Sequence, residues 1–587
     1  MRVKYLDVLK AFAIIAVVLY HCGFLTYGYL GVDLFLVING YLITKGLKDK
    51  ILNNSVFWGG YVEFEISRIV RLLPLLMVAG VVAMIVGFFN MLPDDYENLG
   101  QSIIASNVFG NNILAAITTK NYWDVSNDYK PFMHTWYVGL VMQFYVIYPI
   151  LFYLAGLDKK TPQKTLLTLI SSLAIVSLLI YFGTDNVAQR FYYLPARFFE
   201  FAAGGILALI YKPTENNKPF NAIFVYICYA LLLILLIVNK ELIPDNIKLV
   251  LVVALSCVLI CSKEVLENRV SGNNIFAKIG VASYSIFVWH QVILAFYRYM
   301  YSSKFSILTF VLYIAITSLL AYLSYCFIEK PTSKWLKTKK TKRIFYATFI
   351  AIFISLNGFA AYIYISAGVV RDVPELYVTI ENKHRGMHAE YCDRGYKYDK
   401  PFETEKLHWF VIGNSFGRDF VNVILESDIA DKVEVSYTSD FKKTKNAERF
   451  KKADKVFIST LGLNEELVTE IEVLCLANNL LPKNIVIVGE KNFGESNGQI
   501  YVKRNSEDYF EQYIEVEDRE RFITKNKYFS EIYGDRFLDL MKMVTNNENK
   551  VKVFSPSGHF ISADCRHFSK GGAEYFASLI DWNKYLE

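Results

Sequence analysis

The sequence is constrained most by the long apolar blocks that fill it up to about residue 366. Each block runs for roughly 17–24 residues, the length that a helix needs to cross a bilayer core of ~30 Å. We therefore expect a polytopic α-helical membrane domain with about eleven spans. The expected spans are 8–25, 29–46, 73–91, 135–155, 164–183, 196–212, 219–238, 247–263, 279–299, 305–328 and 344–366. The Gln, Ser and Asn content of 100–118 favours a loop there.

The domain organisation follows from where the apolar character ends. The chain has 587 residues, too many for one domain, and it turns polar and charged after about residue 366. We expect a membrane domain at 1–335, a basic cytoplasmic loop with a final transmembrane helix at 336–366, a linker at 367–405 and a soluble domain at 406–587. The first apolar stretch lacks a small-x-small cleavage site, so we interpret it as a retained helix.

The distribution of Lys and Arg predicts the orientation, because positively charged loops stay in the cytoplasm. With the N-terminus inside, the cytoplasmic loops hold Lys45 to Lys50, Arg68 and Arg71, Lys159, Lys160 and Lys164, Lys212 and Lys218, and the run 337–343. The opposite loops include Pro93-Asp94-Asp95 and Pro244-Asp245. An odd number of spans then puts the C-terminal domain outside the cytoplasm. The basic run is a cytoplasmic loop in this interpretation, and we expect no nucleic-acid partner.

Ionisable side chains within the expected spans are costly, by about 2.5–3.5 kcal/mol or more at mid-bilayer. The candidates are Lys10, His21, Asp33, Arg197, Glu200 and His290. His21 and Asp33 could individually lie in the headgroup region. Arg197 and Glu200, three residues apart, could simply pair with each other. Together these groups favour a polar pocket between helices.

Short motifs follow one another through the membrane domain. They are Tyr5-Leu6-Asp7-Val8-Leu9-Lys10-Ala11 with Val18-Leu19-Tyr20-His21; residues 31–44; Arg68-Ile69-Val70-Arg71-Leu72-Leu73-Pro74; His134-Thr135-Trp136 with Gln143-Phe144-Tyr145; Arg197-Phe198-Phe199-Glu200 with Gly204; Ser283-Tyr284-Ser285 with Trp289-His290; and Phe327-Ile328-Glu329-Lys330-Pro331. In this order they resemble the acyltransferase-3 family of membrane acyltransferases, over about residues 1–335.

The resemblance implies transfer of acyl groups, commonly acetyl, onto carbohydrates of the cell envelope. It makes His21 the essential histidine, and a neutral imidazole can deprotonate a sugar hydroxyl for attack on a thioester. Arg68 and Arg71 suit the phosphates of acetyl-CoA, the expected donor, because guanidinium pairs bidentately with phosphate. Without the resemblance, both arginines would be read as positive-inside anchors. His134 joins the expected membrane pocket, and no metal is expected.

The segment after Trp136 departs from the family's pattern. The family usually has Ser next and a Glu just before Gln-Phe-Tyr. This chain has Tyr137 there, and Val141-Met142 precede Gln143. If the missing carboxylate orients or charges the catalytic groups, activity is altered or lost. A benign variation within the family is the alternative.

The C-terminal region alternates short β-rich runs with helical ones, which predicts a parallel sheet covered by helices. The expected strands are 407–412, 433–437, 455–458, 484–488 and 551–554. The expected helices lie around 416–427, 465–478, 535–545 and 569–582. The fold class is therefore a polytopic membrane domain joined to an extracytoplasmic α/β domain.

The first of these strands ends in Gly413-Asn414-Ser415, at the carboxyl edge of the sheet. Near the end of the chain, Asp564 precedes His567 by three residues and can orient its imidazole to activate Ser415. These elements resemble the SGNH hydrolase superfamily, with Asn414 in place of the usual Asp. The resemblance gives Asn464 the role of an oxyanion donor. A degenerate glycan-binding domain is the alternative.

Two cysteines outside the membrane spans lie far apart in the sequence. We expect a Cys392–Cys565 disulfide, which would close a loop of over 170 residues and contribute ~4–5 kcal/mol on chain-entropy grounds. Cys475, in an apolar helical run, is expected to be buried.

These observations lead to one functional prediction and two alternatives. We expect an O-acyltransferase, with acetyl the best guess, that moves an acyl group from cytoplasmic acyl-CoA across a bacterial plasma membrane onto an envelope polysaccharide. Lipopolysaccharide O-antigen, peptidoglycan and capsule all remain open as acceptors. One alternative is a transporter or scaffold with a glycan-binding domain. The other is a glycan O-acyl esterase.

Overall fold

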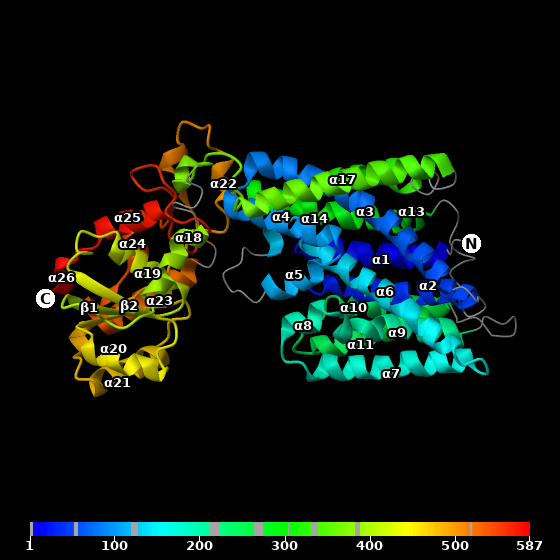
Figure 1. Cartoon of the computed structure of the whole chain (residues 1–587), viewed down its shortest axis with the longest axis horizontal. Helices are drawn as coiled ribbons and strands as arrows, with labels where there is room; N and C mark the ends of the chain where they lie inside the picture. The colour runs from blue at the N-terminus through cyan, green and yellow to red at the C-terminus, as the bar shows by residue number, and fades with distance from the viewer. Residues whose placement is uncertain are drawn as a thin grey trace. The chain divides into compact units, whose positions relative to one another are not determined.

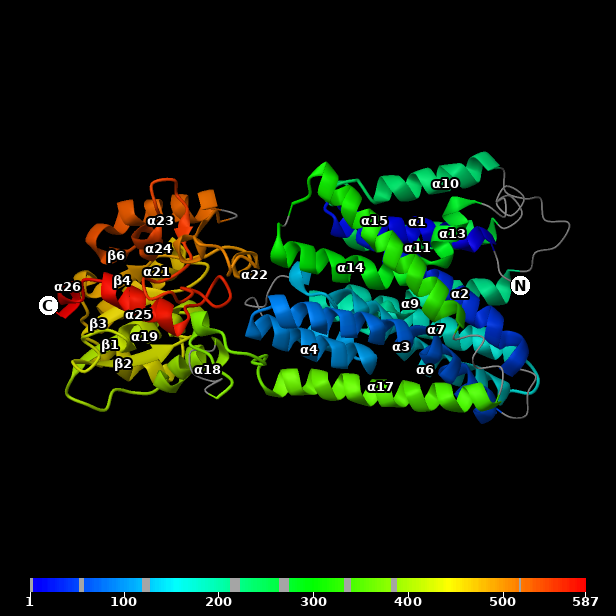
Figure 2. The same cartoon turned by 90° about the horizontal axis from the view of Figure 1, so that it is seen from above.

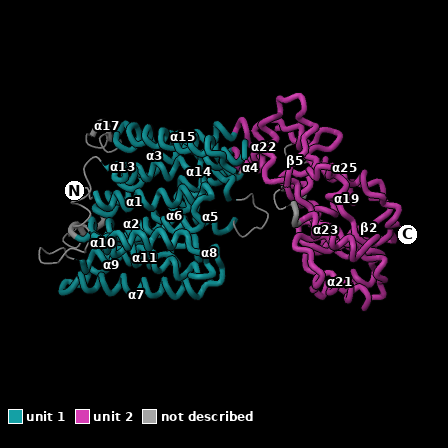
Figure 3. The backbone as a smooth tube through the Cα atoms, turned by 180° about the vertical axis from the view of Figure 1, so that it is seen from behind, with its two compact units in different colours: residues 1–87, 98–362 teal, residues 88–97, 363–587 magenta. Residues whose placement is uncertain are grey.

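The chain forms two compact units, one helical and one α/β (Figures 1 and 3). The computed structural model describes residues 4–51, 57–118, 127–211, 222–262, 274–302, 304–331, 339–381, 388–516 and 519–586. Unit 1 comprises Met1–Gly87 and Asn98–Tyr362, and unit 2 comprises Phe88–Glu97 and Ile363–Glu587.

The helices before residue 366 fall on every expected span. They are α1 (Lys4–His21), α2 (Gly31–Ile51), α3 (Phe57–Asn90), α4 (Pro93–Asn107), α5 (Asn111–Thr118), α6 (Trp136–Gly156), α7 (Pro162–Gly183), α8 (Val187–Tyr192), α9 (Leu194–Ile210), α10 (Ala222–Leu235), α11 (Asp245–Cys261), α13 (Ile275–Val281), α14 (Ser283–Met300), α15 (Ile307–Ser324), the π-helical turn η4 (Tyr325–Glu329) and α17 (Lys339–Ile365). The longer ones run side by side in Figure 1.

The number of helices able to cross a membrane is smaller than the expected eleven. Among the described residues, seven are long and apolar enough, or eight if the bent pair α13 and α14 forms one span. The helix α1 contains three charged residues, Lys4, Asp7 and Lys10, and α10 has only 14 residues. A membrane location follows from these helices, and the count of eleven stays a prediction. Residues 332–338 and the side chains of 339–342, which hold most of the basic run, lie outside the described residues.

The expected loop at 100–118 is wrong, because this segment is helical in α4 and α5. Several of its polar side chains form hydrogen bonds inside unit 1. The amide of Asn112 exchanges hydrogen bonds of 3.1 and 2.8 Å with Gln143. Asn111 Nδ2 donates to Thr135 Oγ1 at 2.8 Å. A polar composition therefore marked an interior hydrogen-bond network here.

Glycines let α2 and α9 approach closely. A Cβ on Gly40 would lie 1.9 Å from the carbonyl oxygen of Phe201, and one on Gly204 would lie 2.0 Å from that of Val37. Neither contact is possible for a larger residue, so both positions require glycine. The same applies where α13 meets α1, since a Cβ on Gly280 would lie 1.7 Å from the carbonyl oxygen of Asp7.

The Gly40 contact can be tested by substitution. We expect Gly40→Ala to destabilise the full-length protein by about 1–3 kcal/mol, because the added methyl must push the two helices apart. Thermal unfolding in detergent measures the change. Gly46→Ala is the matched control on the same helix, because its Cβ would meet nothing within 4 Å. An unchanged midpoint for Gly40→Ala would contradict the close packing.

Unit 2 contains a five-stranded parallel sheet of order β2-β1-β3-β4-β6 (Figure 2). The strands are β1 (Leu407–Ile412), β2 (Val433–Thr438), β3 (Lys455–Ser459), β4 (Ile485–Val488), β5 (Tyr513–Ile514), β6 (Phe537–Leu538) and β7 (Val551–Lys552). The helices are α18 (His388–Asp393), α19 (Ser415–Leu425), α20 (Ala447–Lys452), α21 (Glu465–Ala477), α22 (Gly498–Tyr501), α23 (Arg519–Tyr533), α24 (Leu540–Val544), α25 (Lys570–Leu579) and α26 (Asn583–Leu586).

Helices bury both faces of this sheet, because side chains alternate along each strand. In β1, Trp409 and Val411 pack into a core that includes Phe420 of α19 and Phe576 of α25. Phe410 and Ile412 point to the other face. Their core includes Phe450 of α20, Phe529 of α23, and Val468, Ile471 and Cys475 of α21. The four strands expected from the sequence between 407 and 488 are all present, and Cys475 is buried as expected.

Two elements near the C-terminus differ from expectation. The expected helix at 535–545 divides into β6 and α24, because Phe537 and Leu538 pair with Ile487 and Val488 of β4. Asp539 then caps α24 by accepting the Lys542 N–H at 3.2 Å. The expected strand at 551–554 contributes β7, which pairs antiparallel with β5 outside the parallel sheet.

The segment expected as a linker is largely folded into unit 2. Val369, Val373, Leu376 and Val378 are buried in a cluster with Phe554 and other residues of that unit. Residues 388–398 form α18 and the turn η6 (Arg394–Tyr398). Residues 382–387 lie outside the described ranges. The main part of the second unit therefore begins at Ile363, in the last turn of α17.

Candidate functional site

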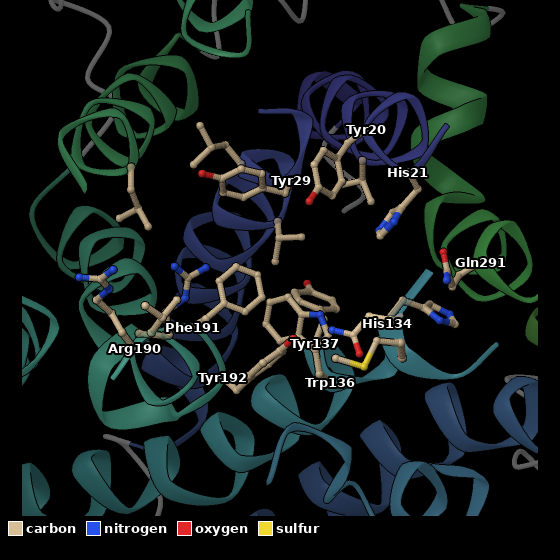
Figure 4. A pocket seen from close by; sticks show the side chains of 18 of the residues that line it. Tyr20, His21, Tyr29, His134, Trp136, Tyr137, Arg190, Phe191, Tyr192 and Gln291 are labelled. Carbon is tan, nitrogen blue, oxygen red and sulfur yellow. The ribbon is translucent and has the colours of Figure 1, made fainter. Parts of the chain in front are cut away.

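The first candidate site is a cavity of about 320 Å³ in unit 1, which we call the histidine cavity. His21, the last residue of α1, and His134, which precedes α6, both line it. Its walls are rich in aromatic side chains: Tyr20, Tyr29, Trp136, Tyr137, Tyr181, Phe191, Tyr192 and Phe287. In Figure 4, His21 and Gln291 lie across the cavity from Arg190. An aromatic wall with a few polar groups suits a polar organic ligand.

Three histidines from separate motifs lie together beside this cavity. The ring centroid of His290 is 5.3 Å from those of both His21 and His134. His290 Nδ1 lies 2.6 Å from the Phe287 carbonyl oxygen, which makes it the protonated nitrogen. Its Nε2 then has no hydrogen-bond partner among the described residues. The sequence named each histidine, but only the packing of α1 and α14 brings His21 and His290 together.

A backbone contact fixes the position of His21. Arg298 Nη2 of α14 donates to the His21 carbonyl oxygen at 2.5 Å.

Within the described residues, no group of three or more His, Cys, Asp or Glu side chains is arranged to hold a metal ion. An imidazole held in place beside a cavity can accept a proton from a bound hydroxyl group.

The second cavity, of about 410 Å³, is lined by Arg68 and Arg71 of α3, and we call it the arginine cavity. Lys10 and Asp7 of α1 also line it, with their side chains 3.3 Å apart. The Arg68 guanidinium stands over the ring of Tyr145 at 5.4 Å. Three basic side chains in one cavity suit an anionic ligand such as a phosphate.

Of the two residues at the place of the missing family carboxylate, one lines the arginine cavity. This residue is Val141, whereas Met142 is buried and is not part of the cavity wall. The carboxylates that line the cavity come instead from Asp7 and from Glu329, which accepts a hydrogen bond from Ser285 Oγ. Sequence reasoning did not single out Glu329 as a cavity residue, although it lies in a quoted motif.

Asp33, Arg197 and Glu200 form a buried ion cluster between α2 and α9. Arg197 Nη2 lies 2.5 Å from Asp33 Oδ1, and Arg197 Nη1 lies 3.1 Å from Glu200 Oε1. All three side chains are at most 3% exposed. The expected pairing of Arg197 with Glu200 is present. Asp33 is buried in the helix contact, where it pairs with Arg197.

The third candidate site is a Ser–His–Asp triad in unit 2. Ser415 Oγ lies 2.8 Å from His567 Nε2, and His567 Nδ1 lies 2.7 Å from Asp564 Oδ2. Asp564 Oδ1 also accepts the backbone N–H of His567 at 2.7 Å. Both the tautomer and the orientation of the imidazole are therefore set for accepting the Ser415 proton. The sequence assignment of these three residues agrees with this geometry.

The turn before Ser415 explains its sequence. Gly413 has a φ of +152°, and a Cβ there would lie 1.8 Å from the Ser459 carbonyl oxygen. Asn414 caps α19 by accepting the Phe416 N–H at 3.1 Å. Ser415 then starts the helix at the carboxyl end of β1, where the helix N-terminus favours negative charge. The Asn that replaces the usual Asp is thus a helix cap.

Asn464 does not lie in an obvious oxyanion position. It caps α21 by accepting the Leu467 N–H at 2.8 Å, and its Nδ2 donates to the Gly462 carbonyl oxygen at 3.2 Å. The neighbouring N–H groups of Gly462 and Leu463 both donate to Glu490 Oε1 at 2.8 Å. The oxyanion role of Asn464 stays a prediction.

A buried ion pair that sequence reasoning missed holds the triad together. Asp419, one turn after Ser415 on α19, lies 2.5 Å from Lys491 Nζ, and the two side chains are 0% and 2% exposed. Both Asp419 oxygens accept the N–H of Phe568, at 3.1 and 2.9 Å. Lys491 also donates to the Arg566 carbonyl oxygen at 2.8 Å. The pair thus ties the loop that carries His567 to the helix that carries Ser415.

The expected disulfide does not form in this structure. Cys565 is a free buried thiol that donates to Asn497 Oδ1 at 3.3 Å. Burial raises the pKa of the Cys565 thiol, so it remains a protonated donor. The side chain of Cys392 lies outside the described residues. The loop that carries His567 is held by hydrogen bonds to Lys491 and Asp419.

Removal of Lys491 tests this anchoring. We expect Lys491→Met to destabilise unit 2 of the full-length protein by about 3–5 kcal/mol, because Asp419 is left as an uncompensated buried charge. The double variant Asp419→Asn/Lys491→Met should recover part of the loss, since no unpaired charge remains. Thermal unfolding followed by circular dichroism measures both. Lys483→Met, at an exposed position of unit 2, is the control. Equal unfolding midpoints for wild type and Lys491→Met would contradict the anchor.

These features define an integral membrane protein with polar cavities inside a helical bundle, joined to an α/β domain with a hydrolase-type triad. Residues 3–327 match the acyltransferase-3 family, described as an acyltransferase domain. Because the match covers more than half of the chain, the chain belongs to this family.

Curated relatives match a little more than half of the chain. O-acetyltransferase OatA from Staphylococcus aureus, in strains NCTC 8325 / PS 47 and COL, is 28% identical over 360 residues. The alignment covers 56% of this chain and 57% of each relative, so the chain spans little more than half the length of the curated relatives that it matches. No solved structure matches the chain.

Proposed function

We propose that this protein is an O-acyltransferase that takes an acyl group, acetyl in the first instance, from acyl-CoA and delivers it to a hydroxyl group of an envelope polysaccharide. The observation that carries the proposal is the pair of cavities in the family-matched unit, one with arginines and one with histidines. Together they offer an anion-binding place for a donor and a proton acceptor for an acceptor hydroxyl. The name of the relatives, O-acetyltransferase, agrees with this chemistry.

The donor occupies the arginine cavity in this proposal. Arg68 and Arg71 bind its phosphates, and Lys10 adds a third positive charge. Lys10 and His21 are eleven residues apart on α1, which is about 16 Å along a helix axis at 1.5 Å per residue. The pantetheine arm of coenzyme A can carry the thioester across such a distance, away from its phosphates.

The hydroxyl group of a first alcohol, which carries the acyl group on to unit 2, reacts beside the histidine cavity. His21 takes the hydroxyl proton as the oxygen bonds to the thioester carbonyl carbon. The carbon–sulfur bond then breaks, and the sulfur leaves as the thiol of coenzyme A after gaining that proton. His134 and His290 position His21 and keep the site polar. The whole sequence transfers an acyl group without any change of oxidation state.

Unit 2 completes the transfer through Ser415, as its resemblance to SGNH hydrolases suggests. His567 takes the Ser415 proton as Oγ attacks the incoming ester, and an acyl-serine forms while the first alcohol leaves. A sugar hydroxyl then attacks the acyl-serine, and Ser415 regains its proton. The proposed topology places the N-terminus in the cytoplasm and unit 2 outside a bacterial plasma membrane, where the acceptor glycan lies.

The triad itself supports a second candidate, a glycan O-acyl esterase. Its geometry of 2.8 and 2.7 Å serves hydrolysis as well as transfer, because water can replace the sugar hydroxyl as the attacking group. A transporter or scaffold with a glycan-binding unit 2 would use neither Ser415 nor His21. The two substitutions below separate these functions.

Replacement of Ser415 tests the relay through unit 2. We expect Ser415→Ala to reduce glycan acylation to the level of cells that lack the gene, because no acyl-serine can form. Mass spectrometry of envelope glycans gives the number of acyl groups per repeating unit. Ser578→Ala, at an exposed position on α25, is the control. Unchanged acylation would rule out the relay, and increased acylation would support the esterase.

Replacement of His21 tests the membrane step. We expect His21→Gln to slow the release of coenzyme A from acetyl-CoA by about 100-fold or more, the contribution expected of a general base. A thiol reagent measures the release by purified full-length protein in detergent, with a soluble oligosaccharide as the hydroxyl acceptor. His408→Gln in unit 2 is the control, because it lies outside the family-matched segment. A rate equal to that of the wild type would favour the transporter or scaffold.

A further inference from the structure

We propose that Tyr137 and Phe287 form an aromatic partition between the two cavities, and that the Tyr137 ring limits the length of the acyl chain that can react. The inference rests on the proposed function, since it concerns the donor of that same site. It assigns a specificity role to Tyr137, one of the positions where this chain departs from the family's usual pattern.

Two residues belong to the walls of both cavities, and they are Tyr137 and Phe287. Their ring centroids lie 5.3 Å apart at an interplanar angle of 63°, an edge-to-face contact. On one side of this contact lie His21 and His134, and on the other lie Arg68 and Arg71. A donor held by the arginines therefore meets this ring pair before its thioester reaches His21.

A hydrogen-bond chain holds the Tyr137 ring in place. Asn39 Nδ2 of α2 donates to the Tyr137 hydroxyl oxygen at 2.7 Å. The Tyr145 hydroxyl in turn donates to Asn39 Oδ1 at 3.2 Å. The Tyr145 ring also lies under the Arg68 guanidinium. A chain of contacts therefore links Arg68, the proposed anion-binding group, to the Tyr137 ring.

The histidine cluster supports the other ring. The centroid of Phe287 lies 4.8 Å from that of His134 and 5.8 Å from that of His290. Phe287 is thus wedged between the imidazoles and Tyr137, and it has little room to move aside. Tyr137 is half-buried, and Asn39 holds its hydroxyl group.

The chemistry of the donor follows from this placement. A thioester carbonyl that reaches His21 must lie against the two rings, and its acyl chain must fit the space that they leave. An acetyl group adds one methyl carbon beyond the carbonyl, whereas a hexanoyl group adds five carbons that compete with the Tyr137 ring. The family's usual Ser at this position would leave that space open.

The test compares donors of increasing length. Purified full-length protein in detergent is given a soluble oligosaccharide as the hydroxyl acceptor and, in turn, acetyl-CoA, butyryl-CoA or hexanoyl-CoA, and the release of coenzyme A is measured. We expect the wild type to prefer acetyl-CoA. In Tyr137→Ala and Tyr137→Ser, the ratio of the hexanoyl rate to the acetyl rate should rise about tenfold or more, a typical effect of changing the fit of methylene groups in a pocket.

Two further variants separate ring size from other effects. Tyr137→Phe keeps the ring but loses the hydroxyl that accepts from Asn39, so we expect the chain-length ratio of the wild type. If Tyr137→Phe behaves like Tyr137→Ala, the ring does not set the limit and the inference is overturned. Tyr153→Ala, at an exposed position on the same helix, should leave both rates unchanged.

The outcome also distinguishes this inference from the proposed function. A wild type that neither binds acetyl-CoA nor releases coenzyme A from it would overturn both. A wild type active on acetyl-CoA, with the same chain-length ratio in Tyr137→Ala, would overturn the partition alone. Equilibrium binding of the three donors provides a second measurement if the Ala variant is slow. Tighter hexanoyl-CoA binding by that variant, relative to acetyl-CoA, supports the partition.

Discussion

The close contact between α2 and α9, with Arg197 held between Asp33 and Glu200, is the interaction on which the membrane unit depends. Glycines at 40 and 204 bring the two backbones together, and Arg197 pairs with Asp33 and Glu200 beside this contact. This contact positions both proposed sites. Arg197 lines the histidine cavity, and α2 supplies Asn39, which supports the Tyr137 ring. A buried charge cluster of this kind is costly to break and therefore fixes one arrangement of the helices.

Unit 2 also contains a buried ion pair that joins two parts of its fold. The pair of Asp419 and Lys491 is buried and holds a loop to a helix. Without it, the distance from Ser415 to His567 would depend on a mobile loop, and catalytic geometry tolerates little misplacement. In both units, then, a buried ion pair positions groups that are proposed to do chemistry, although the pair itself does not touch the reacting atoms.

Much of the fold could be predicted because it rests on local patterns. Apolar blocks of membrane length predicted the helices, and β-rich runs between helical ones predicted a parallel sheet. The errors arose where local pattern and tertiary context disagree. Asn111 and Asn112 are residue types common in loops, yet both donate hydrogen bonds inside the bundle, to Thr135 and to the Tyr192 carbonyl oxygen. The strand β6 has two residues, too few for any periodicity, and it forms because β4 leaves an edge open. The Cys392–Cys565 disulfide was predicted without knowledge of the distance between the two sulfur atoms. The Cys565 thiol donates a hydrogen bond to Asn497 instead.

The sequence by itself determined the class of each unit, the family of the first, and the identity of the triad. These depend on hydropathy, on motif order and on residue types that chemistry requires. Only the tertiary structure decided which residues meet. It gathered His21, His134 and His290, separated them from Arg68 and Arg71 by the rings of Tyr137 and Phe287, and placed Lys491 behind the triad. Such contacts join residues that lie up to hundreds of positions apart in the sequence. They depend on how the shapes and charges of packed elements fit together, which no local sequence pattern contains.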